Sequence, residues 1–125
     1  MKRVLLSIFV TLISTTSFAS GKLTYLSCPK LDDRAPDLIV ILDEQSSTAS
    51  LQAPSSGSGL NFTSKAAFGP VEVSWRKDSQ SLKQTYSIDR QSLVLNRKTF
   101  SEMSGSTHIN SSACTVVKSN RKNKI

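Results

Sequence analysis

The sequence predicts an all-β fold, a small antiparallel barrel or sandwich of about seven or eight strands. Short apolar runs follow one another at fairly regular spacing, and clusters of turn-forming residues separate them. Several of these runs alternate apolar and polar residues, as strands do when they bury one face. No apolar stripe with the helical period of about 3.6 residues continues for the length of a helix.

The predicted strands are, in chain order, 22–28, 38–42, 48–53, 71–76, 84–88, 93–95 and 113–117, and a Ser/Gly-rich loop from residue 54 leads to one short irregular strand. The alternation predicts these inward-facing residues: Ala49, Leu51, Ala53, Val71, Val73, Trp75, Gln84, Tyr86, Ile88, Leu93 and Leu95. The run at 38–42 is continuously apolar, so we expect it to be covered on both faces or to lie centrally. Residues 97–112 are polar and poorly patterned.

Residues 85–95 predict a hairpin that turns at 89–92. In this hairpin Ser87, Asp89 and Val94 should point outward or into the turn, because a slip of one residue would move the whole apolar set to the other face.

The N-terminus has the three parts of a secretory signal peptide. A basic start is followed by an apolar run at 4–13 and by small residues up to Ala19. The apolar run has about half of the roughly 20 residues that a membrane span needs. We therefore expect residues 1–19 to be a signal peptide and residues 20–125 to be a single β-domain with a basic tail at 118–125. The mature protein, without a transmembrane segment, would be periplasmic or extracellular.

The two cysteines, Cys28 and Cys114, predict one disulfide, because an even number of cysteines in an exported chain is typically paired. The alternatives are two free thiols or a metal pair. With His108 as the one histidine of the chain, the set is a poor match for zinc. A disulfide requires Cα atoms within about 7 Å, so the first and last strands should lie together. This favours a closed or nearly closed barrel, and a two-sheet sandwich with adjacent ends remains compatible.

The net charge of +7 is unevenly distributed. Residues 61–125 hold eleven basic and four acidic side chains, whereas residues 20–60 hold three basic and five acidic ones. A basic half could meet an anionic envelope surface or an acidic protein, and the alternative is a soluble surface with a charged tail. We do not expect a nucleic acid partner, because the few aromatic side chains, such as Trp75 and Tyr86, belong to the predicted core.

No catalytic constellation emerges from the sequence. No acid at an informative spacing orients His108, so we expect a surface histidine. Asp32-Asp33 and Asp43-Glu44 lack the ladder of a calcium loop and are expected to be solvated loop carboxylates. We therefore predict no enzyme, no metal and no cofactor. The remaining function is that of a small exported binding module in the cell envelope.

Two short motifs add a resemblance. Ser58-Gly-Leu-Asn-Phe62 is followed by Trp75-Arg-Lys77, and Tyr25 precedes the first cysteine. In these features the chain resembles the C-type lysozyme inhibitor family, whose members are small exported barrels with an S-G-x-x-aromatic loop, a W-x-K loop and one disulfide near the chain ends. The resemblance implies that Ser58 and Lys77 enter among the catalytic carboxylates of a lysozyme. The alternative is an envelope accessory protein that uses its basic half to bind anionic lipid or glycan.

Overall fold

The computed structural model describes residues 23–56 and 58–118, with the backbone alone for Ser58. The predicted signal peptide and the tail beyond Lys118 lie outside the described residues. Within these ranges the elements are one short 3₁₀ helix, η1, and nine strands: β1 (Leu23–Ser27), β2 (Ile39–Asp43), β3 (Thr48–Gln52), η1 (Ser58–Leu60), β4 (Phe62–Phe68), β5 (Glu72–Asp78), β6 (Leu82–Asp89), β7 (Val94–Ser101), β8 (Thr107–Ala113) and β9 (Thr115–Val117). No helix in this part of the chain is long and apolar enough to cross a membrane.

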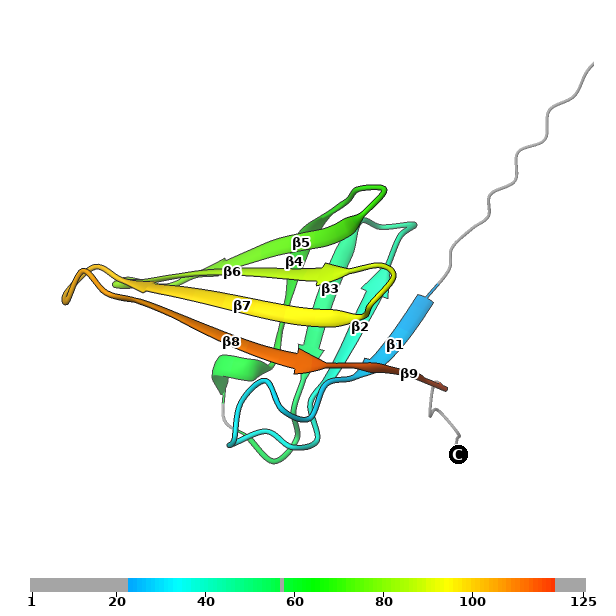
Figure 1. The fold of residues 1–125 in the computed structure, drawn as a ribbon, viewed down its shortest axis with the longest axis horizontal. Coiled ribbons are helices and arrows are strands. Elements are labelled where there is room, and N and C mark those ends of the chain that lie inside the picture. The colour runs from blue at the N-terminus through cyan, green and yellow to red at the C-terminus, as the bar shows by residue number, and fades with distance from the viewer. Residues whose placement is uncertain (1–22, 57, 119–125) are drawn as a thin grey trace, which may run out of the picture.

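The strands form one antiparallel sheet in the order β8-β7-β6-β5-β4-β3-β2-β1-β9. Only Cys114 separates β8 from β9, yet β8 pairs with β7 and β9 pairs with β1 at the other edge. The sheet therefore curls into a nearly closed barrel (Figure 1). The all-β prediction is confirmed. The described residues form nine strands where about seven or eight were expected, because β8 lies in the polar region 97–112, for which no strand was predicted.

The disulfide between Cys28 and Cys114 is formed, with Cα atoms 4.4 Å apart. Cys28 directly follows β1, and Cys114 marks the corner between β8 and β9. Nearby, the backbone amide of Lys30 donates to the Ser112 hydroxyl at 3.1 Å, which holds the loop after β1 against β8. The chain-entropy argument assigns such a long covalent loop about 4 to 5 kcal/mol of stabilisation.

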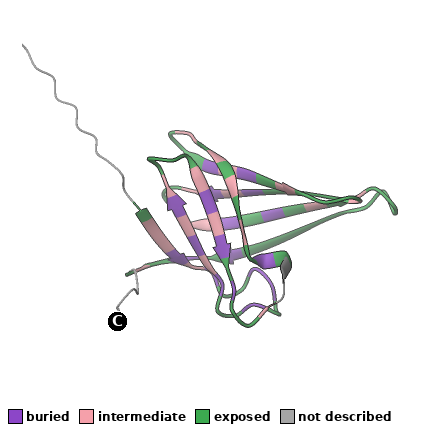
Figure 2. Cartoon of the chain, turned by 180° about the vertical axis from the view of Figure 1, so that it is seen from behind, coloured by how far each residue is buried: buried purple, intermediate pink, exposed green. Residues whose placement is uncertain are grey.

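The core fills the barrel with side chains from most of its strands (Figure 2). The predicted inward residues that are buried are Ala49, Leu51, Ala53, Val73, Trp75, Tyr86, Ile88 and Leu95. Along the apolar run at 38–42 the alternate residues Val40 and Leu42 are buried, whereas Ile39 and Ile41 are half-buried. The expectation of cover on both faces is thus only partly met.

One inward assignment near a turn, that of Val71, is wrong, and that of Leu93 is met in part, because Leu93 packs against the core without being fully buried. Val71 is 66% exposed and precedes β5, because the Gly69 amide donates to the Glu72 carbonyl and closes a tight turn around it. Leu93 is half-buried and has a φ of 59°, which places it in the turn after β6 instead of in a strand. The hairpin register itself is confirmed, since Ile88 pairs with Leu95.

The strands β4 and β7 are longer than predicted, and β8 was not predicted. β4 spans seven residues, and β7 and β8 together occupy most of the polar region 97–112. In Figure 1 the strands β5 to β8 reach well beyond β1 to β3. Their outer parts extend beyond the core, so apolar side chains there, such as Phe100 and Ile109, are exposed and do not alternate regularly with polar ones.

Candidate binding surface at one end of the barrel

The inner face of β5 to β8 carries three cross-strand rows of side chains. One row is apolar and belongs to the core: Val73, Ile88 and Leu95. The middle row mixes aromatic and polar groups: Trp75, Tyr86, Arg97 and Asn110. The third row is polar and half-buried to exposed: Lys77, Gln84, Thr99 and His108. The polarity therefore rises along these strands from the core toward one end of the barrel.

Stacked aromatic rings form the floor of this end. The Trp75 and Tyr86 rings are nearly parallel, 2° apart, with centroids separated by 5.5 Å. Phe62 from β4 tilts against Tyr86 at 5.7 Å. The expected core position of Trp75 is confirmed, since it is 3% exposed. The Trp75 indole nitrogen and the Tyr86 hydroxyl have no hydrogen-bond partner among the described residues. Burial raises the pKa of Tyr86, and the charge of Arg97 opposes this shift.

A buried ion pair closes one side of the surface. Arg97 Nη2 donates to Asp32 Oδ2 and to Asn110 Oδ1, both at 3.2 Å. Asp32 also accepts from the Nε and Nη2 atoms of Arg34, at 2.9 and 2.8 Å. Hydrogen bonds from Arg34 and, more weakly, from Arg97 hold the pKa of Asp32 well below its ordinary value, although burial opposes the shift.

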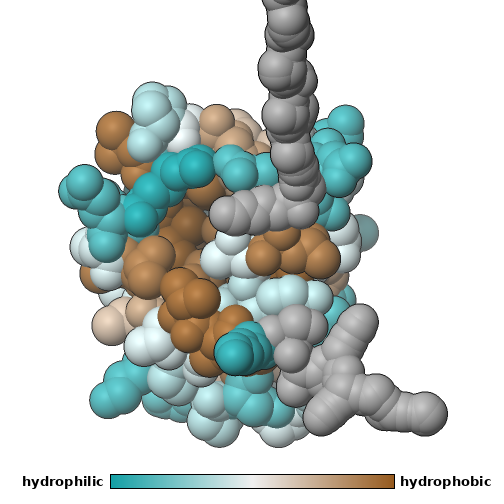
Figure 3. All heavy atoms as spheres, turned by 90° about the vertical axis from the view of Figure 1, so that its right-hand side faces the viewer, coloured by the Kyte–Doolittle hydropathy of each residue, from teal (hydrophilic) through white to brown (hydrophobic). Residues whose placement is uncertain are grey.

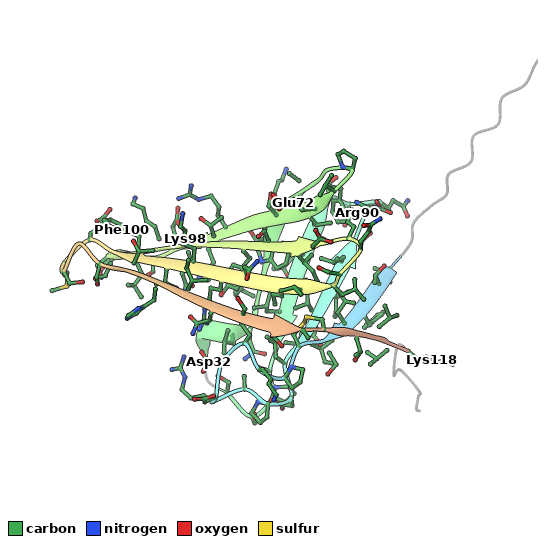
Figure 4. All side chains as sticks on the ribbon, in the orientation of Figure 1. Asp32, Glu72, Arg90, Lys98, Phe100 and Lys118 are labelled. Carbon is green, nitrogen blue, oxygen red and sulfur yellow. A yellow bond between two sulfur atoms is a disulfide. The ribbon has the colours of Figure 1, made fainter. Side chains whose placement is uncertain are left out.

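The prediction that Asp32 is a solvated loop carboxylate is therefore wrong, whereas its neighbour Asp33 is exposed as expected. Asp32 lies in the loop beneath β8 (Figure 4). A buried carboxylate needs a compensating charge, and Arg97 supplies it from the region that had no recognisable pattern. The signal was present in the spacing, because Arg97 and Thr99 continue the period of two that Leu95 begins.

The loop that carries Ser58 is held at its base. The Asn61 side chain accepts from the Ala53 amide at 2.9 Å and donates to the Ala53 carbonyl at 3.2 Å. Leu60, at the end of η1, is 2% exposed and anchors the loop in the core. Asp37 accepts hydrogen bonds from the amide and the hydroxyl of Ser55, at 3.0 and 2.6 Å. Ser58 itself begins η1.

Lys77 of β5 contacts Phe62, the first residue of the strand that follows this loop. Its ammonium nitrogen lies 5.5 Å from the centroid of the Phe62 ring, within the range of a cation–π contact. Phe62 ends the first sequence motif and Lys77 ends the second, so the two motif segments meet at one rim of the barrel. Beside them β4 and β5 part, and the Ser64 hydroxyl bridges the gap by donating to the Arg76 carbonyl at 2.8 Å.

The polar row beside Lys77 was not recognised in the sequence. Gln84 Nε2 donates to Thr99 Oγ1 at 3.4 Å, and His108 is exposed, as expected. No group of three or more His, Cys, Asp or Glu residues in the described ranges could hold a metal ion. The surface offers a cation, amide and hydroxyl groups and an aromatic edge, all of which can contact a bound ligand.

The described domain has a smaller net charge than the whole sequence, but it keeps the charge asymmetry, with eight basic and four acidic side chains in residues 61–118. Residues 23–56 and 58–118 hold ten Lys and Arg and nine Asp and Glu, a net charge of +1. The remaining six basic residues lie outside this part of the chain.

No family model, curated protein or solved structure matches this chain.

Proposed function

We propose that this protein is an exported, non-catalytic binding module that inhibits a lysozyme of the C type. The observation that carries the proposal is the contact between Lys77 and Phe62, because it unites the two motifs of the inhibitor resemblance at one rim. The disulfide adds support, since such bonds persist in oxidising compartments outside the cytosol.

The chemistry of the target explains why a lysine suits this role. Lysozymes cleave glycosidic bonds with two carboxyl groups, of which one must be protonated to act as the general acid. An ammonium group placed between them favours the ionised form of both. Lys77 would therefore occupy the cleft and also remove the proton that catalysis requires. The Ser58 hydroxyl would add a hydrogen bond to the same pair.

The rim is pre-organised for such an insertion. The stem of Lys77 is half-buried and its head rests over Phe62, so part of its rotamer entropy is already lost before binding. The clamp between Asn61 and Ala53 fixes the base of the Ser58 loop. Pre-organisation of this kind improves affinity because less ordering remains for the complex.

Ion pairs within the described residues reduce the number of cations that are available to bind anionic lipid or glycan. Five of the ten described Lys and Arg residues form ion pairs, and their cations are Arg34, Arg76, Lys83, Arg90 and Arg97. Residues 20–125 hold fourteen Lys and Arg and nine Asp and Glu, a net charge of +5, so long-range charge alone does not favour one function over the other, and salt dependence must separate them.

The test compares Lys77→Met with Lys65→Met in an assay of peptidoglycan hydrolysis by a C-type lysozyme. Lys65 is exposed on β4 and serves as the control. Truncating one partner of a buried charge pair costs about 3 kcal/mol, so Lys77→Met should weaken inhibition roughly 100-fold. Lys65→Met should change it less than about threefold. Equal effects of the two substitutions, or no inhibition by the unaltered protein, would refute the proposal.

Salt separates the two functions. Binding to vesicles that contain phosphatidylglycerol should collapse between low and moderate salt if an anionic surface is the target. Inhibition of a basic lysozyme should persist, because its central contacts are excluded from solvent and screening reduces the residual repulsion of like net charges. Salt-sensitive vesicle binding without inhibition would support the accessory function instead.

A further inference from the structure

A hollow lies at the end of the barrel opposite the rim of Lys77. Its volume is about 250 Å³, and its apolar lining consists of Leu26, Leu42, Phe68, Val73, Ile88, Leu93 and Val116. Figure 3 looks onto this end of the molecule and shows a hydrophobic depression bordered by hydrophilic atoms. Four of the lining side chains, those of Leu26, Leu42, Val73 and Ile88, are buried and belong to the core. The hollow is thus an opening into the barrel interior.

One residue that lines the hollow, Leu93, has a strained backbone conformation. Leu93 has a φ of 59°, in the left-handed region that residues other than glycine rarely adopt. It is held there because its amide donates to the Asp89 carbonyl and its carbonyl accepts from the Cys114 amide, both at 2.9 Å. This geometry keeps an incompletely buried leucine against the hollow. Strained residues that persist in a structure are concentrated at functional sites.

The rim of the hollow is charged, and its balance is negative. Arg90 is held by two contacts, with the Glu44 carboxylate at 3.1 Å and the Gly69 carbonyl at 3.0 Å. Asp89 adds a second carboxylate to the lining. The amides of Ser92 and Gln91 donate to Asp89 and lower its pKa, so this group is ionised at neutral pH. Two carboxylates and one guanidinium give the rim a net charge of −1.

We propose that this hollow is a binding site for a small apolar molecule whose polar end carries no negative charge. A cavity of 150 Å³ with a similar lining accommodates benzene, so 250 Å³ suits an alkyl chain or ring of up to about ten carbon atoms. The lining supplies apolar burial, and Thr24 and the Glu44–Arg90 pair supply hydrogen-bonding groups at the mouth. A carboxylate at the mouth would meet the two acidic side chains.

Titration of the full mature protein with 1-octanol, octylammonium and octanoate at neutral pH, followed by NMR chemical shifts, tests the site. Octanol and octylammonium should bind, with shifts centred on Ile88, Leu93 and Val116. Octanoate should bind about fivefold more weakly than octanol because of the negative rim. Absence of octanol binding would overturn the site, and equal affinity for octanoate would overturn the assigned ligand charge.

Two matched valines provide the control. Val116 lines the hollow and is 63% exposed, whereas Val71 is 66% exposed and lies outside it. Val116→Trp should fill the mouth and weaken octanol binding at least about tenfold, and Val71→Trp should change it less than about twofold. Equal effects of the two would refute the location. A urea melt of both variants verifies that each is folded. Lysozyme inhibition is measured separately, so failure here leaves the proposed function standing.

Discussion

Replacing Asp32 by Asn removes the buried ion pair that links the loop after β1 to the long strands, and so measures its contribution to stability. The Asp32 and Arg97 side chains are 8% and 9% exposed, whereas Arg34 is 76% exposed. The Arg34 pair is therefore screened by water and contributes little, and the cost of the substitution comes from the uncompensated charge of Arg97. Removing one partner of a buried pair costs about 3 to 5 kcal/mol, and the remaining amide oxygen places Asp32→Asn near the lower value.

Urea unfolding at neutral pH measures this cost, and Asp33→Asn is the matched control because Asp33 is the exposed neighbour. The control should change the free energy of unfolding by less than about 0.5 kcal/mol. Asp32→Asn combined with Arg97→Met should cost less than the sum of the single substitutions, because the second change removes the stranded charge. Equal effects of Asp32→Asn and Asp33→Asn would refute the ion pair as described.

Asp32 also predicts a pH dependence, because hydrogen bonds from Arg34 and, more weakly, from Arg97 favour its ionised form. The pKa of Asp32 is lower in the folded protein than its ordinary value of 3.8, so the folded state binds this proton less readily than the unfolded state. The stabilisation is therefore complete above the ordinary carboxyl range and is lost as the pH falls through it toward the folded pKa. The difference in stability between wild type and Asp32→Asn should be constant from pH 7 to 5 and shrink below about pH 4.

Two further predictions concern the hairpin and the crosslink. Ile88→Ala should lower the free energy of unfolding by about 2 to 5 kcal/mol, because Ile88 is fully buried. Ser87→Ala, on the opposite face, should change it by no more than about 0.5 kcal/mol. If urea melts show a similar loss of stability for the two variants, the register is wrong. Titration of the denatured, unreduced protein should detect no free thiol from Cys28 or Cys114, and two reactive thiols would contradict the closed corner between β8 and β9.

The half of the barrel that surrounds the core could be predicted from the sequence. Ala49 and Leu51, or Tyr86 and Ile88, alternate with polar neighbours because one face of each strand is buried, and this alternation fixes the register. The outer parts of β7 and β8 could not be predicted in the same way. Their side chains are mostly polar, and the apolar ones, Phe100 and Ile109, are exposed. These parts of the strands are held by backbone pairing with each other, which the side-chain pattern does not reveal.

The site was only partly predictable for a related reason. The motifs identified the Ser58 loop and Lys77 as candidates, but the contact of Lys77 with Phe62 depends on how β4 leaves β5. Asp32 was misjudged because its partner, Arg97, is 65 residues away along the chain. Local spacing describes hydrogen bonds within a turn, such as those of Asp89, and carries no information on ion pairs between distant segments.

The rows on β5 and β6 explain how one small barrel can offer two separate surfaces. Val73 borders the apolar hollow and Lys77 borders the polar rim, and four residues of extended chain separate them. At about 3.3 Å per residue this is roughly 13 Å, beyond the distance of about 7 to 10 Å within which substitutions usually couple. In Figure 4, Arg90 beside the hollow lies at one end of the long strands and Phe100 lies at the other. The aromatic row of Trp75 and Tyr86 lies between the two surfaces and is closely packed, so occupation of the hollow should leave the rim, and with it the insertion of Lys77, unchanged.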